Sequence, residues 1–148
     1  MSPNARSRLD TLIRGPVQRT YLMSIDGFWA ERVLDEFVFA EDRGFVIETI
    51  HFHQQGDFVR YRGPHGEILL EFFPDGNHIS ATVALAGGEF AFSGEIDRLA
   101  VERTNIRLPS KLPLNRRVIA ANVHFWADVL RSLADELLGD PVAPTIER

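Results

Sequence analysis

Two histidines separated by one residue are the first candidates for chemistry in this chain of 148 residues. His51 and His53 form an H-x-H pair, and the period of a β-strand would point both imidazoles to one face, close enough to share a metal ion. A zinc site needs at least one further ligand, which neighbouring turns or strand starts could supply as His65, Asp75 or His78. The alternative is a solvated sheet face that carries polar residues and no metal. The pair therefore supports two hypotheses, a small metal-dependent module and a polar surface.

Charged and polar side chains recur at alternate positions around this pair. Period-two geometry predicts that they share the face of the histidines, as Thr49, Arg60, Arg62, Glu71, Ser80 and Thr82. The other face would be filled by Ile50, Phe52, Val59, Tyr61, Ile79 and Val83. The pattern leaves the phase of the segment around Glu71 open. An ion pair of Arg60 or Arg62 with Glu71 would stabilise the sheet and would also suit recognition. The predicted partner-binding residues are His51, His53, Arg60, Arg62 and Glu71.

A basic cluster precedes the last predicted helix. It consists of Arg107, Lys111, Arg116 and Arg117. Free backbone N–H groups and the helix dipole could there hold a phosphate or a partner's carboxylate, so we predict an anion-binding site. The alternative is that these charges keep a proline-containing linker solvated and balance an acidic protein body.

Other catalytic signatures are absent from the sequence. No serine lies in a G-x-S-x-G context, and the turn at 63–66 lacks the lysine of a phosphate-binding loop. His124 and Asp128 stand four residues apart and can pair on a helix, which is common on helix surfaces. The chain has no cysteine, which excludes disulfides, thiolate zinc sites and a thiol nucleophile. We therefore expect no cofactor.

A sheet must position the candidate residues. Alternating hydrophobicity predicts strands over 45–53, 57–62, 67–73, 78–85 and 89–93. The intervening turns are short enough for hairpins and too short for parallel crossovers, which indicates an antiparallel meander.

Two amphipathic helices should flank this sheet. The first begins at Ser24 or Asp26, ends near Asp42, and is followed by Gly44 as a terminator. The second carries an apolar stripe and ends at the glycine of position 139; the stripe is Ile119, Val123, Trp126, Leu130, Leu133 and Leu137. Residues 95–113 are compatible with a short helical turn or a last strand. The fold class is thus α+β, an antiparallel sheet of about five strands packed against an N-terminal and a C-terminal helix.

The ends of the chain are expected to lie outside this domain. We predict a basic, flexible arm over 1–22, a single domain over 23–140 and a flexible tail over 141–148. Residues 23–148 contain 12 basic and 20 acidic residues, a formal charge of −8, which argues against nucleic acid as a partner. Apolar stretches such as 68–73 are too short to cross a membrane, and no secretory signal is recognisable. With no cysteine, the expected location is the cytoplasm.

Three segments carry a resemblance to known proteins. They are G-D-F-V-R-Y-R-G-P at 56–64, E-I-L-L-E-F-F-P-D-G at 67–76 and A-N-V-H-F-W-A-D-V-L at 121–130. Over about 26–138 the layout resembles small bacterial proteins, including immunity-like families that neutralise toxins. The resemblance implies a helix, a strand meander and a closing helix that bind one protein partner, and it assigns no functional residue.

The function expected from these observations is a noncatalytic cytoplasmic protein-binding module of immunity or secretion-chaperone type. It would bind a toxin or effector through the polar sheet face or an exposed edge strand, and a homodimer is also compatible with the sequence. An acidic body suits a basic partner. The alternatives are a small metal-dependent enzyme that uses His51 and His53, and a domain that binds an apolar small molecule between the sheet and Trp29 or Trp126.

Overall fold

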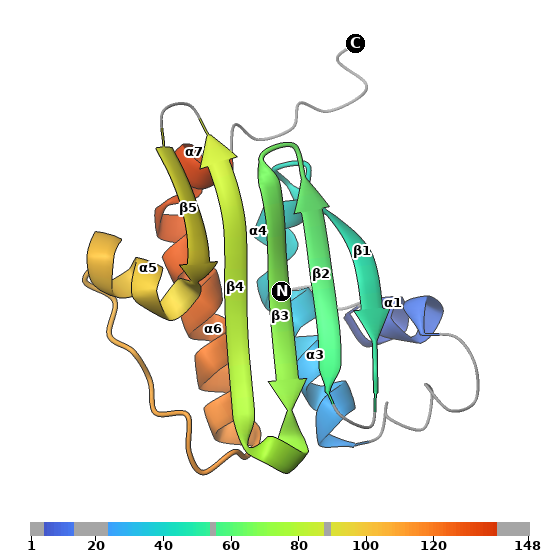
Figure 1. Ribbon diagram of the computed structural model, residues 1–148. Helices are drawn as coiled ribbons and strands as arrows, with labels where there is room; N and C mark the ends of the chain where they lie inside the picture. Colours follow the sequence, from blue (N-terminus) through green and yellow to red (C-terminus); the bar gives the residue numbers. More distant parts are fainter. Residues whose placement is uncertain (1–4, 14–23, 54–55, 88–89, 139–148) are drawn as a thin grey trace.

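A five-stranded antiparallel sheet forms one layer of the protein (Figure 1). The computed structural model describes residues 5–13, 24–53, 56–87 and 90–138. The strands are β1 (Val46–His51), β2 (Asp57–Gly63), β3 (Gly66–Phe73), β4 (His78–Gly87) and β5 (Phe90–Glu95), and they pair in sequence order. This is the predicted meander, because each strand pairs antiparallel with the next strand along the chain. The α+β class expected from the sequence is confirmed.

Two of the hairpin turns use backbone conformations that need particular residues. Gly66 has a φ of 136°, and a Cβ there would lie 1.9 Å from the carbonyl oxygen of Ala84, so only glycine fits. The 3-10 turn η2 (Pro74–Gly76) ends at Asn77, whose φ of 50° is left-handed. Glycine and asparagine at these two positions therefore permit the short turns that the sequence predicts.

The N-terminal helical segment is broken in two. Helix α3 (Ile25–Glu36) begins at Ser24, which accepts a hydrogen bond from the Asp26 N–H as the N-cap. Helix α4 (Val38–Glu41) follows after Phe37, whose φ of −100° and ψ of 17° interrupt the helix. Phe37 is fully buried and stacks on Tyr61 of β2 with ring centroids 5.8 Å apart. The expected continuous helix is thus replaced by two, because Phe37 is anchored on the sheet.

The closing helix is confirmed and also has a break. Helix α6 (Arg116–Ser132) is followed by α7 (Ala134–Leu137), and the break lies at Leu133. The stripe residues with described side chains are buried, namely Ile119, Val123, Trp126, Leu130 and Leu133. The stripe therefore packs on the protein's own core.

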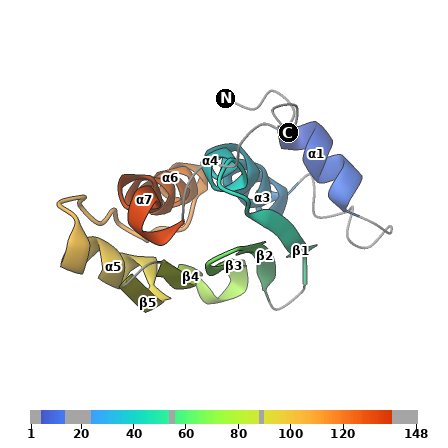
Figure 2. The ribbon, with the colours of Figure 1, turned by 90° about the horizontal axis from the view of Figure 1, so that it is seen from above.

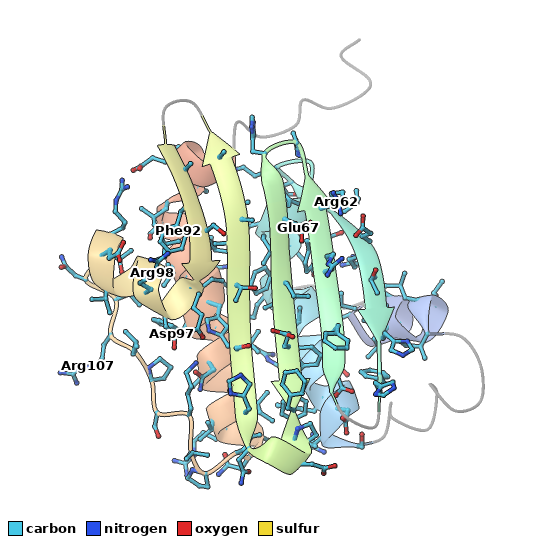
Figure 3. The ribbon with its side chains drawn as sticks, viewed as in Figure 1. Arg62, Glu67, Phe92, Asp97, Arg98 and Arg107 are labelled. Carbon is cyan, nitrogen blue, oxygen red and sulfur yellow. The ribbon has the colours of Figure 1, made fainter. Side chains whose placement is uncertain are left out.

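The segment left open in the sequence contains a helix. Helix α5 (Ile96–Arg103) follows directly after β5 and buries Ile96, Leu99 and Ala100. The Arg98 guanidinium lies 4.5 Å from the centroid of the Phe92 ring, and Figure 3 shows the two side chains together. This contact folds α5 back against β5.

The expected N-terminal arm is partly wrong. Residues 5–12 form helix α1 (Ala5–Leu12), which packs on α3. Leu9 and Ile13 are buried in the core, and Arg8 forms an ion pair with Glu41 at 2.8 Å. Apolar residues spaced by four give even this basic segment a core-facing side. Residues 1–4 and 14–22 of the predicted arm and the tail at 141–148 lie outside the described residues.

The two longest of the described helices, α3 and α6, lie on one side of the sheet (Figure 2). Figure 2 shows α3, α4, α6 and α7 in one layer above the strands, and none of the described helices on the opposite side of the sheet. The core between the layers contains Trp29, Val33, Val59, Leu70 and Trp126, all fully buried. Within the described ranges, no helix has the length and apolar character that crossing a bilayer requires. Among the described elements, no layer thus covers the other face of the sheet.

Candidate functional site

The uncovered side of the sheet, called the open face, carries the predicted site residues. Strand register places His51, Phe58 and Glu71 in one row across β1, β2 and β3. The open face also carries Glu48, Thr49, Arg60, Arg62, Glu67, Leu69, Phe73, His78, Ser80, Thr82, Ala84, Ser93 and Glu95. The opposite face holds buried residues such as Tyr61 and Val83. The predicted division of the two faces is confirmed, and the phase of β3 is settled.

Four charged residues form what we call the charged ladder, across β1, β2 and β3. Arg62 bonds Glu48 through Nε and Glu67 through Nη2, the latter at 3.2 Å. Arg60 lies 3.8 Å from Glu48 and 3.9 Å from Glu67. Figure 3 shows Arg62 and Glu67 at the same end of the sheet. The hydrogen bond from Arg62 lowers the pKa of Glu48 and raises the pKa of Arg62. Each arginine is thus held between two carboxylates.

The expected ion pair with Glu71 is wrong. Register places Arg62 opposite Glu67 and Glu71 opposite Phe58, so the arginines meet a different carboxylate. Glu48 reaches the ladder beside a register shift in β1 between Ile47 and Thr49, which sequence alternation does not reveal. The predicted binding residues therefore fall into two groups on one face.

The second group is an aromatic row at the other end of the open face. It consists of His51, His53, Phe58, Phe73 and His78. The Phe58 and Phe73 rings meet edge to face at 6.2 Å between centroids, and Phe73 lies 5.7 Å from His78. The rings of His51 and His53 are 6.0 Å apart. Phe58 and Phe73 were not among the predicted site residues, although their outward strand positions could have indicated them.

The histidine pair does not gather a third metal ligand in the described part of the chain. His51 ends β1 and His53 follows the strand, so the expected strand over 45–53 is shorter than predicted. No group of three or more His, Cys, Asp or Glu side chains there could hold a metal ion. The described geometry therefore gives the metal hypothesis no further support.

A buried acid pair lies beneath the histidines and was missed by the sequence analysis. Asp57 at the start of β2 is fully buried, and Asp26 in the first turn of α3 is 8% exposed. Ser24 Oγ donates to Asp26 at 2.8 Å, and the His53 N–H donates to Asp57 at 3.2 Å. Burial, then a hydrogen bond with Asp26 and the charge of Asp26, raise the pKa of Asp57 to about 9. Asp57 thus keeps its proton at neutral pH and helps position the loop of His53.

Part of the open face is hollowed. A groove of about 300 Å³ is lined by Glu67, Leu69, Thr82, Val83, Ala84, Ser93 and Gly94. A second groove, of about 490 Å³, shares Ala84 and Ser93 with the first and is lined mainly by apolar atoms. Short side chains at these positions leave room for groups from a partner.

The basic cluster does not converge on one anion site. Lys111 pairs with Asp97 at 2.8 Å, and the Arg116 guanidinium lies 4.7 Å from the centroid of the Phe28 ring. Arg107 points away from the fold (Figure 3), and Arg117 is exposed at the start of α6. Lys111 and Arg116, two of the four predicted residues, therefore make contacts within the protein.

The predicted pair on the last helix forms and connects two helices. His124 Nε2 lies 3.1 Å from Asp128, and its Nδ1 lies 3.2 Å from Glu36 of α3. Glu36 also bonds Arg32 at 2.8 Å. Because Glu36 belongs to α3 and His124 belongs to α6, their contact holds the two helices together.

The place suggested for an apolar ligand is filled by the protein itself. Trp29 is fully buried and stacks on Phe72 of β3, with ring centroids 5.5 Å apart. Trp126 is also fully buried, and its Nε1 lies 3.4 Å from Asp97. Both tryptophans thus act as core residues.

Comparisons with protein-family models, with curated proteins and with solved structures found no match to this chain.

Proposed function

We propose that this chain is a noncatalytic cytoplasmic protein-binding module, of immunity or secretion-chaperone type, whose open face binds a basic toxin or effector. The observation that carries the proposal is a sheet covered by helices on one face and exposing aromatic rings on the other. Phe58 and Phe73 are only partly buried there. Aromatic side chains are enriched at the centres of protein interfaces, because they bury large apolar areas at low entropic cost.

The charge of the open face supports a basic partner. Its carboxylates outnumber its guanidinium groups, because Glu71 and Glu95 add to the balanced ladder of two arginines and two glutamates. The formal charge of −8 over 23–148 has the same sign. Such a surface attracts a cationic protein and accelerates its association.

The polar contacts of this face suit a rigid surface. The ladder joins β1, β2 and β3, and the Ser80 hydroxyl donates to Glu71 at 3.4 Å across β3 and β4. These contacts fix the outward side chains before a partner arrives, which lowers the entropy lost on binding.

A matched pair of arginine substitutions, each at an exposed alanine, tests the proposal. Ala84 is exposed between the two grooves of the open face, and Ala121 is exposed on α6 in the helical layer. Ala84→Arg should fill the grooves and add a positive charge, whereas Ala121→Arg adds the same group elsewhere. Tagged wild type and both variants would be expressed in the native cell, and the captured protein would then be purified for affinity measurement.

We expect wild type and Ala121→Arg to bind the same basic protein and Ala84→Arg to bind it at least about tenfold more weakly. Equal binding by Ala84→Arg would contradict the proposal. A stable homodimer that dissociates only in Ala84→Arg, measured by light scattering, would instead assign the face to a second copy. If the captured protein is toxic alone and harmless when co-expressed with this chain, the immunity type is favoured over the chaperone type.

A further inference from the structure

Glu71 occupies an unusual position at the boundary of the aromatic row. Across the sheet it stands opposite Phe58 on β2 and Ser80 on β4. Along β3, its neighbours on the open face are Leu69 and Phe73. A carboxylate is thus surrounded by one hydroxyl and three apolar side chains on a surface that is otherwise accessible.

This carboxylate forms no ion pair among the residues that the structure describes. Glu48 and Glu67 each lie between Arg60 and Arg62, whereas the contact of Glu71 is the Ser80 hydroxyl at 3.4 Å. Apolar neighbours reduce the screening of the charge by water, so a cation from a partner would gain more here than at a fully solvated carboxylate.

The rings next to Glu71 can contribute to the same cation. Phe58 and Phe73 meet edge to face, and both side chains are only partly buried. The Phe73 ring also lies over Gly56, where a Cβ would approach Cε1 of that ring to 2.2 Å. Glycine at position 56 therefore permits this placement of the ring. An aromatic face attracts Arg and Lys through its quadrupole, and Arg also stacks on it.

We propose that Glu71, Phe58 and Phe73 form a subsite for one arginine or lysine side chain of a protein partner. The carboxylate would take the charge-assisted hydrogen bond, and the rings would cover the apolar part of the side chain. This inference rests on the proposed function, because it specifies how the open face recognises a basic protein.

Backbone NMR titration with a small probe tests the subsite without the partner. The probe is acetyl-Gly-Arg-Gly-amide, and the control is the same peptide with citrulline, which keeps the shape of arginine and lacks its charge. Glu71→Gln removes the charge at the subsite. Glu95→Gln is the matched control, because Glu95 lies on the open face opposite Thr82 with no aromatic residue across the strand pair. Phe73→Leu removes one ring and retains the carboxylate.

We expect the arginine peptide to shift the amide signals of Phe58, Glu71 and Phe73 in a saturable way. Its affinity should fall about tenfold in Glu71→Gln and less than about twofold in Glu95→Gln. Phe73→Leu should weaken binding by about two- to fivefold. Equal shifts by the citrulline peptide, or unchanged affinity in Glu71→Gln with an intact spectrum, would overturn the subsite. The open-face proposal is judged separately, by Ala84→Arg and the purified partner.

Discussion

Asp57 at the start of β2 is buried close to Asp26 in the first turn of α3, and the charge of Asp26 adds to burial in raising the pKa of Asp57. Two carboxylates in contact cannot both ionise without strong repulsion, so one proton is retained between them. The pair connects the sheet to the helical layer directly beneath the loop that carries His53. This relationship gives stability a pH dependence that can be measured.

The sign of that dependence follows from the pKa of Asp57, which rises from 3.8 to about 9 on folding. Between these values the folded chain binds a proton that the unfolded chain has lost, so the free energy of unfolding falls as pH rises from about 4 to 9. The contribution is at most about 1.4 kcal/mol per pH unit. Asp57→Asn cannot ionise and should flatten this slope.

Urea unfolding of wild type and Asp57→Asn at several pH values, followed by tryptophan fluorescence, checks this prediction. Asp75→Asn is the control, because Asp75 is exposed in the turn η2. Parallel pH profiles for wild type and Asp57→Asn would show that the buried pair does not control stability.

Helix α1 is predicted to belong to the folded core. Leu9 is fully buried, whereas Leu12 on the same helix is 37% exposed. Leu9→Ala should therefore lower the free energy of unfolding by about 2–5 kcal/mol, because it leaves a cavity, and Leu12→Ala should change it by less than about 1 kcal/mol. Chemical denaturation measures both values. Equally small effects would mean that this segment does not pack on α3.

The hydroxyl group of Tyr61 is not expected to stabilise the fold. Tyr61 is fully buried, and its hydroxyl oxygen has no hydrogen-bond partner among the described residues. Removing an unsatisfied buried polar group also removes its desolvation cost, so Tyr61→Phe should leave stability unchanged or raise it by about 1 kcal/mol. A thermal melt compares the two proteins. A clear loss of stability in Tyr61→Phe would reveal a bonded hydroxyl.

The charged ladder should stabilise the sheet only modestly. Arg62 is 55% exposed and Glu67 is 33% exposed, so water screens their attraction. A double-mutant cycle with Arg62→Gln and Glu67→Gln should give a coupling energy of about 0.2–1 kcal/mol that declines with added salt. A coupling that salt does not change would indicate a contact other than the ion pair.

Strand alternation made the faces of β2 predictable. Val59 and Tyr61 alternate with Arg60 and Arg62, so only one phase buries apolar side chains. In β3 the run E-I-L-L-E-F-F places apolar residues on both faces, and its phase could be settled only by pairing with β2 and β4. Glu67 and Glu71 share one face in either phase, so the choice between them depended on the strand register, which places Arg62 opposite Glu67.

Other features depend on contacts between distant residues. The helical pattern continues through Phe37, and the break there arises because the ring stacks on Tyr61. Nothing in the sequence indicates that Asp26 and Asp57 lie close together, because only the folded topology brings α3 and β2 into contact. The aromatic row could have been predicted in part, since Phe58 and Phe73 occupy outward positions of their strands.

Site-specific photo-crosslinking in the native cell tests the central claim most directly. A photoreactive phenylalanine analogue would replace Ala84 on the open face in one variant and Ala121 on α6 in another. The open-face account predicts a crosslink to one basic protein from position 84 and none from position 121. Crosslinking of that protein from position 121 alone, or equally from both positions, would contradict it.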